Sequence, residues 1–190
     1  MKMRLALPSC LILIACLLQG CAPLETKDSD EEARVAQERA SSDAYRDDMR
    51  IEYSALDRIY DQFKILIHVN VTSFNRHVLI SGEVPDESIK AAIEKIVSEI
   101  EGVRHLNNEL VISGNSSLTS RSNDSMITSS IKLQLARDSR IGAERIKAVS
   151  ENGTVFLLGK VPHAEADTAA EIASTTGRVK LVVKLFEYTD

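Results

Sequence analysis

The chain has 190 residues and a net charge of −5, and it contains no tryptophan. Its length allows one medium domain or two small ones, and the core must be largely aliphatic because only 4% of the residues are aromatic. Acidic side chains dominate the first half, which disfavours nucleic acid as a partner, whereas residues 114–190 carry ten basic and nine acidic side chains and could approach an anionic surface without repulsion.

The first 20 residues have the pattern of an export signal. Lys2 and Arg4 form a basic start, and the apolar run that follows ends at Leu18, which is shorter than the ~20 residues of a membrane-spanning helix. The run leads into Leu18-Gln19-Gly20-Cys21, which resembles the lipobox of bacterial lipoproteins. This resemblance implies cleavage before Cys21 and lipidation of that residue on its sulfur and its new amino group. The alternative is an ordinary secreted protein with a cysteine at this position.

The cysteine count is consistent with a lipid anchor. Cys10 and Cys16 lie within the signal, so Cys21 is the only cysteine expected in the mature chain, and no disulfide can form within it. In lipoproteins of this type an aspartate after the cysteine favours the inner membrane. Ala22 stands here, so the resemblance implies an outer-membrane anchor with the protein facing the periplasm. The composition of residues 21–47 predicts an acidic, flexible tether.

The rest of the chain contains an internal repeat. Residues 78–85 read VLISGEVP and residues 155–162 read VFLLGKVP. Flanking positions also match, and these pairs, such as Asp48 and Asp124, lie 76 residues apart. The repeat predicts two modules, residues 48–113 and 123–189, joined by a linker at 114–122.

Each module is predicted to begin with a helix. We expect Asp48 and Asp124 to cap these helices, because a carboxylate can accept hydrogen bonds from the free backbone N–H groups of a helix start. Apolar residues then recur at every fourth position and predict one buried face in each helix, formed by Ile51, Ala55 and Ile59 in the first module and by Ile127, Ile131 and Leu135 in the second.

A hairpin, a second helix and a last strand follow in both modules. The second hairpin turns at Asn152-Gly153, a pair that readily adopts the positive φ angles of a tight turn. Gly82 and Gly159 end the second hairpin strands, where glycine indicates a positive φ or the close approach of another backbone, so we expect a structural role rather than ligand contact. The predicted element order is α-β-β-α-β, repeated twice.

This order, with Gly-x-x-Pro between the hairpin and the second helix, resembles a BON domain. The tandem pair behind a lipobox is similar to the dual-BON-domain outer-membrane lipoproteins, the family of division- and outer-membrane-stress-associated lipid-binding lipoproteins. The strongest matching segments are residues 70–72, 123–128 and 151–157. The resemblance implies an α+β fold in which each module has a mixed three-stranded sheet covered by two helices. It also implies non-enzymatic binding of anionic phospholipid through the second module, in support of envelope integrity.

The first helix of the second module carries a second stripe. At ~100° per residue, Met126, Leu133 and Arg137 lie together and away from the buried face, with Arg140 beyond them and Lys132 on the far side. Apolar side chains flanked by cations suit the boundary between lipid headgroups and acyl chains, so these five residues are the predicted lipid-binding set. Packing of the apolar pair against the first module or the linker would explain the stripe equally well.

No pattern indicates catalysis or metal binding. The four histidines show no metal-ligand spacing and are expected at solvated strand or loop positions: His68, His77, His105 and His163. Neither a glycine-rich phosphate loop nor a Gly-x-Ser-x-Gly elbow is present. We therefore expect no enzyme, cofactor, metal, small-molecule substrate or nucleic acid. The alternative to lipid binding is a protein–protein adaptor that contacts an envelope assembly or division machine through an edge strand or the groove between the modules.

Overall fold

The computed structural model describes residues 42–64 and 67–190. All of these described residues belong to one compact unit of the chain. The predicted signal peptide, the lipidation site Cys21 and most of the predicted tether lie outside the described residues. Within the described ranges, no helix combines the length and the apolar character needed to cross a bilayer.

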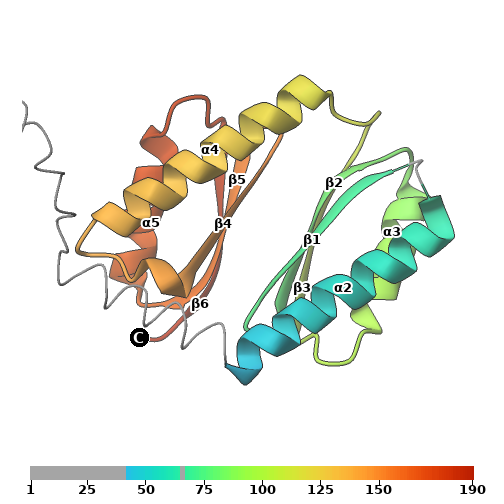
Figure 1. Cartoon of the computed structure of the whole chain (residues 1–190), viewed down its shortest axis with the longest axis horizontal. Helices are drawn as coiled ribbons and strands as arrows, with labels where there is room; N and C mark the ends of the chain where they lie inside the picture. The colour runs from blue at the N-terminus through green and yellow to red at the C-terminus, as the bar shows by residue number, and fades with distance from the viewer. Residues whose placement is uncertain (1–41, 65–66) are drawn as a thin grey trace, which may run out of the picture. The chain divides into compact units, whose positions relative to one another are not determined.

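The described chain forms two modules with the same order of elements (Figure 1). The first contains α2 (Asp43–Phe63), β1 (His68–Phe74), β2 (His77–Val84), α3 (Glu87–Ser98) and β3 (His105–Ile112). The second contains α4 (Leu118–Arg137), the short 3-10 helix η2 (Ala143–Arg145), β4 (Ile146–Glu151), β5 (Thr154–Val161), α5 (His163–Thr175) and β6 (Leu181–Tyr188). The predicted α+β fold of two tandem modules is thereby confirmed.

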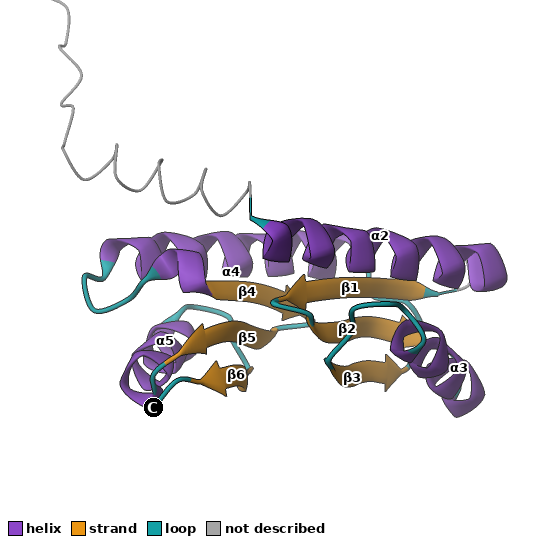
Figure 2. Cartoon of the chain, turned by 90° about the horizontal axis from the view of Figure 1, so that it is seen from below, coloured by secondary structure: helices purple, strands orange, loops and turns teal. Residues whose placement is uncertain are grey.

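Each module has a mixed sheet of three strands. The middle strand, β2 or β5, pairs antiparallel with its hairpin partner and parallel with the last strand of the module. Figure 2 shows the two sets of three strands with their helices beside them. The parallel pairing follows from the chain path, because the second helix carries the chain back to the start of the sheet before the last strand begins.

The core of each module lies between its sheet and its helices. All six residues of the predicted helix faces are buried there. The second helices of the two modules differ in the size of their buried apolar side chains. Helix α3 buries Ile93 and Val97, whereas α5 buries Ala166, Ala169 and Ala173. Small side chains at a helix–sheet contact allow a shorter distance between the helix axis and the sheet than large ones do.

The predicted helix caps are wrong. Helix α2 begins after Ser42, whose side chain accepts a hydrogen bond from the backbone N–H of Tyr45, and α4 begins after Ser117, which accepts one from Ser120. Both helices therefore start earlier than predicted, and Asp48 and Asp124 lie inside them on the buried face. A serine at the N-cap satisfies the same free N–H groups that the aspartates were expected to serve.

The buried Asp48 holds the turn of the first hairpin instead. Its carboxylate accepts hydrogen bonds from the backbone N–H groups of Asn75 and Arg76, both at 2.8 Å, and from the hydroxyl of Ser73 at 2.6 Å. Asn75 and Arg76 both have positive φ, an arrangement that favours glycine and that this pair adopts without one. The carboxylate thus stabilises a turn whose own residues are poorly suited to it.

Asp124 has the same role in the second module. It accepts hydrogen bonds from the backbone N–H groups of Asn152 and Gly153 at 2.8 Å, and both turn residues have positive φ, as the Asn-Gly pair predicted. The two modules therefore share a tertiary contact between the first helix and the hairpin turn, in addition to their repeated sequence.

The second face of each sheet packs against the other module. An apolar centre is formed by Phe74, Leu79, Phe156, Leu158 and Leu185, all of them buried. In Figure 1 the helices of each module lie on the outer side of its sheet, and the two sheets face each other. At one edge of this contact Lys147 Nζ lies 2.7 Å from Glu52 Oε1 and donates a hydrogen bond to the carbonyl of Ser73 at 3.1 Å.

Candidate membrane-binding site

The outward face of α4 is the strongest candidate for a functional surface. The opposite face of the helix is buried against the sheet, so the residues between the core positions point to solvent. Met126 is 59% exposed and Leu133 is 51% exposed. These fractions favour a contact surface over packing against the described part of the first module, the alternative that the sequence left open.

Leu118 extends this face and was missed by the sequence analysis. It is 81% exposed, and it lines a shallow hollow together with Ser122, Met126 and Arg178. The sequence-based helix began at Asp124, so Leu118 was not placed on the helical wheel. The preceding Ser117, a favourable N-cap residue, was the signal that could have located the true start of the helix.

Two exposed cations of α4 lie on different sides of the helix: Arg137 shares the stripe of Met126 and Leu133, whereas Lys132 lines a hollow with Glu52, Leu135 and Glu144. Lys132 and Arg137 are exposed, and within the described ranges no carboxylate lies at ion-pair distance from either one. Arg178, a further cation that the sequence analysis did not select, donates a hydrogen bond to Asn123 Oδ1 at 2.8 Å and lines the hollow beside Met126. The uncompensated positive charges of this face therefore come from both α4 and the loop before β6.

Arg140 differs from the other predicted cations because it has an acidic partner. Its Nη2 lies 2.7 Å from Asp138 Oδ2, and its Nε and backbone N–H both donate to Asp138 Oδ1 at 3.0 Å. The side-chain hydrogen bond from Arg140 is the largest cause that lowers the pKa of Asp138 to about 2. Asp138 is therefore ionised at neutral pH and offsets the charge that Arg140 was expected to offer a membrane.

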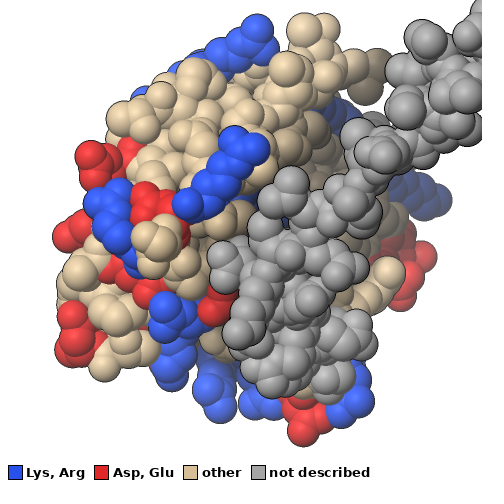
Figure 3. Space-filling view, turned by 60° about the vertical axis from the view of Figure 1, so that its left-hand side comes forward, with Lys and Arg blue, Asp and Glu red and all other residues tan. Residues whose placement is uncertain are grey.

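The distribution of charge over the second module is visible in Figure 3. In this view, Lys and Arg side chains lie among uncharged ones in the upper part and again along the lower edge, whereas acidic side chains lie mainly along the left side. Exposed Leu118, Met126 and Leu133 with cations nearby combine apolar contact with attraction to anions, which is the pattern of proteins that lie at a membrane interface.

Both glycines at the ends of the hairpin strands stand where a side chain has no room. Gly82 has a φ of +121°, and a Cβ there would lie 2.0 Å from the carbonyl oxygen of His68. Gly159 has no positive φ, but its Cβ would lie 2.6 Å from the carbonyl oxygen of Arg145. Close approach of another backbone at both positions supports the predicted structural role.

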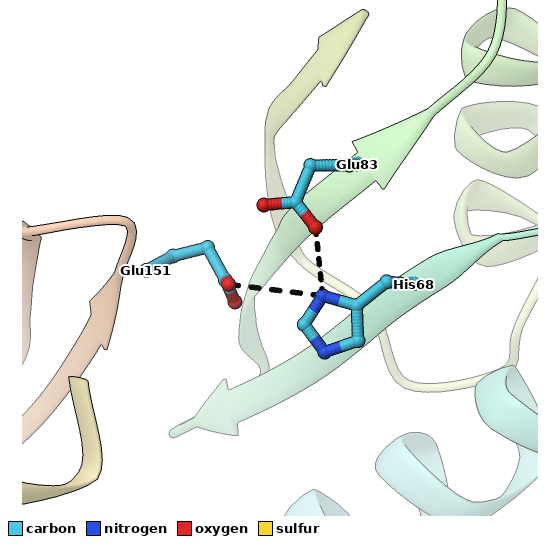
Figure 4. Close-up of side chains that lie close together, drawn as sticks. All are labelled: His68, Glu83 and Glu151. Atoms are coloured by element: carbon cyan, nitrogen blue, oxygen red, sulfur yellow. Dashed lines mark hydrogen bonds and ion pairs between the residues drawn. The ribbon is translucent and has the colours of Figure 1, made fainter. Parts of the chain in front are cut away.

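One histidine departs from the solvated positions that we expected. His68 on β1 is largely buried, and its Nδ1 lies 2.9 Å from Glu83 Oε2 and 3.7 Å from Glu151 Oε1 of the other module (Figure 4). Burial raises the pKa of the Glu151 carboxyl, an effect that the hydrogen bond from Asn70 and the nearby His68 partly oppose. Chain spacing could not reveal this cluster, because its members come from three strands.

Comparison with known proteins identifies the class to which this fold belongs. The sequence matches the BON domain model at residues 57–114 and again at residues 123–190, so the chain belongs to the BON domain family. Each match covers most of one module, which agrees with the repeat.

Two relatives cover nearly the whole chain. The chain is 35% identical over 175 residues to the outer membrane lipoprotein DolP of Haemophilus influenzae, and the aligned region covers 91% of this chain and 91% of that protein. It is 32% identical over 163 residues to the 21 kDa hemolysin of Actinobacillus pleuropneumoniae, with 85% and 84% of the two chains covered. These relationships define a dual-BON-domain lipoprotein anchored by lipid in the outer membrane, with a role in the cell envelope. Neither relative is named as an enzyme.

Among solved structures, the C-terminal domain of CdsD, a structural protein of the type III secretion system of Chlamydia trachomatis, is similar at 10% identity. The match covers 73% of this chain and 96% of that domain, with a TM-score of 0.32, and this low similarity supports no conclusion about function.

Proposed function

We propose that the chain binds anionic phospholipid membranes through the outward face of α4, and that this binding supports the integrity of the envelope. The acylated Cys21 would hold the protein at the outer membrane, facing the periplasm. The observation that carries the proposal is the set of exposed apolar side chains on α4, with Arg137 in the same stripe and Lys132 on the far side of the helix. Within the described part of the chain, neither cation has an acidic partner at ion-pair distance.

The magnitudes are suited to an interaction that adds to a lipid anchor. Burying a half-exposed Met126 or Leu133 at the acyl boundary contributes about 1 kcal/mol for each side chain. Each cation near an anionic surface adds about 1 kcal/mol. Two or more acyl chains already give stable residence, so the helix would set how the protein lies on the lipid surface rather than whether it stays there.

The proposal assigns this function to the second module alone. Helix α2 of the first module carries exposed acids, Asp57 and Asp61, on the face that matches the lipid-binding face of α4. These carboxylates would repel an anionic surface. The matching helix therefore serves as an internal control for the assignment.

A charge reversal tests the proposal. The chain from residue 22 on, which lacks the anchor, is expected to float with vesicles that contain phosphatidylglycerol but not with phosphatidylcholine vesicles. Replacing both Lys132→Glu and Arg137→Glu should weaken this binding by more than about 30-fold, since two cations near the surface contribute about 2 kcal/mol.

The matched control is Arg58→Glu with Lys95→Glu, two exposed cations of the first module whose reversal changes the net charge by the same amount. Binding should survive in this control. Equal losses in the two variants, or full binding after the reversal on α4, would contradict the proposal and favour a protein–protein adaptor.

A further inference from the structure

A second cluster lies where the two modules meet, away from α4. His68 on β1, Glu83 on β2 and Glu151 on β4 point toward one another (Figure 4). One potential ligand atom from each residue lies within 4.8 Å of the other two. The closest pair, His68 Nδ1 and Glu83 Oε2, is separated by 2.9 Å.

The charges in this cluster are not balanced. The side chains of Glu83 and Glu151 are only 5% and 9% exposed. Within residues 42–64 and 67–190, no lysine or arginine lies at ion-pair distance from either carboxylate, and His68 is their only basic neighbour at that distance. Buried carboxylates require a compensating cation or good hydrogen bonds, and one imidazole offers at most a single positive charge to the two of them.

We propose that His68, Glu83 and Glu151 form a binding site for a divalent transition-metal ion of the zinc type. One imidazole nitrogen and two carboxylate oxygens are ligands that zinc accepts, and a water molecule would complete a tetrahedral set. Ligand atoms around such an ion lie about 3.3 Å apart, given bonds of about 2.0 Å. The separations of 2.9 and 3.7 Å from Nδ1 to the two carboxylates bracket this value, so small movements suffice.

Neighbouring groups orient the proposed ligands. The side-chain amide of Asn70 donates to Glu151 Oε2 at 2.9 Å, which leaves Oε1 of that carboxylate directed at His68. The backbone N–H of Ser116 donates to Glu83 Oε2 at 3.2 Å. Hydrogen bonds that fix ligating carboxylates are typical of metal sites, where they contribute to affinity.

The site would join the two modules. His68 and Glu83 belong to the first module and Glu151 to the second, so a bound ion would be coordinated from both sides of the contact between the sheets. Metal binding should therefore stabilise the association of the modules, because an ion that binds only the folded arrangement raises its stability. This inference is independent of the proposed lipid function.

The first test uses the chain from residue 22 on, which retains the whole compact unit 35–190 and contains none of the three cysteines that could bind zinc through a thiol. Calorimetric titration with Zn²⁺ should show one saturable equivalent per chain and an increased melting temperature. In NMR spectra the ring signals of His68 should shift before those of His77, His105 and His163. No saturable binding, or shifts confined to the other three histidines, would overturn the proposal.

The second test replaces a ligand. Glu151→Gln keeps the shape of the side chain and removes its charge, and it should weaken zinc binding by about 100-fold while binding of phosphatidylglycerol vesicles stays unchanged. The control is Glu99→Gln, an exposed glutamate at the end of α3. Equal affinity in Glu151→Gln and the control would contradict the site. If Glu151→Gln does not fold, the NMR titration of the unchanged chain still decides.

Discussion

The first helices of the two modules occupy the same place in the same fold, yet they present different surfaces. Their buried faces correspond position by position at a separation of 76 residues: Ile51 with Ile127, Ala55 with Ile131, and Ile59 with Leu135. The aspartate that holds the hairpin turn also corresponds at this separation. The inner faces of the two helices are alike because both must pack against a sheet and hold a hairpin turn.

The outer faces differ most in charge. The positions that match Met126, Leu133 and Arg137 of α4 are occupied in α2 by Arg50, Asp57 and Asp61. Arg50 is itself paired, with Asp47 at 3.4 Å and Glu101 at 3.5 Å. Helix α2 also exposes the large side chain of Tyr53, so an exposed apolar group alone does not distinguish the helices. The absence of acids on the α4 face is what makes it a membrane candidate.

The difference between the two helices is tested most directly by giving α4 the outer residues of α2. The triple variant Met126→Arg, Leu133→Asp and Arg137→Asp should lose more than about 100-fold in affinity for phosphatidylglycerol vesicles. It removes about 2 kcal/mol of apolar contact, and because the added arginine offsets one of the two added aspartates, the net charge of the face still becomes more negative by the equivalent of one reversed cation. Its thermal unfolding should change little, since all three side chains are exposed. Vesicle flotation and circular dichroism measure the two effects, and affinity within tenfold of the unchanged chain would refute the assignment.

The shared inner contact is tested by removing the turn aspartates. Asp48→Ala and Asp124→Ala should each lower the free energy of unfolding by about 2–3 kcal/mol, because turn N–H groups lose a charged acceptor. The larger loss is expected for Asp48, which accepts three hydrogen bonds where Asp124 accepts two. Urea titration gives both values. Asp61→Ala, an exposed neighbour on α2, should stay within about 0.5 kcal/mol of the unchanged chain.

Substitutions that make the outer face of α2 resemble that of α4 provide a gain-of-function test. In the triple α4 variant, the substitutions Asp57→Leu and Asp61→Arg on α2 should restore about tenfold in vesicle affinity, since they remove two repelling charges and add one cation. Flotation against the triple variant alone measures the gain. No recovery would show that the surroundings of α4, such as Arg178, are required as well as its own side chains.

The smallest effect is expected at the ion pair beside the lipid face. Asp138→Asn frees Arg140 and should strengthen vesicle binding by up to about fivefold, the equivalent of one cation near the surface. The Arg140 guanidinium holds the pKa of Asp138 at about 2, below the usual 3.8, so folding favours its ionised form. The contribution of the pair to the stability of the fold is complete well above pH 3.8 and is lost only as the pH falls toward 2. Vesicle affinity of Asp138→Asn relative to the unchanged chain should consequently be constant between pH 5 and 8.

The places where prediction failed share a physical cause. Asp48 was assigned to a helix cap because its partners in the turn lie 25 to 28 residues further along the chain. Arg140 was counted as a free cation because its pairing with Asp138 depends on the irregular backbone after α4. Leu118 was missed because helix ends depend on single capping residues, which carry a weaker signal than the periodicity of a buried face.

The sequence by itself determined the element order, the buried helix faces, the Asn-Gly turn and the duplication, because each of these depends on local periodicity or on residue preferences within a few positions. Only the tertiary structure decided that Met126 and Leu133 are exposed, that the two sheets pack face to face, and that His68, Glu83 and Glu151 meet. These features arise from residues far apart in the chain, which strand pairing and module packing bring together, and no local pattern records such proximity.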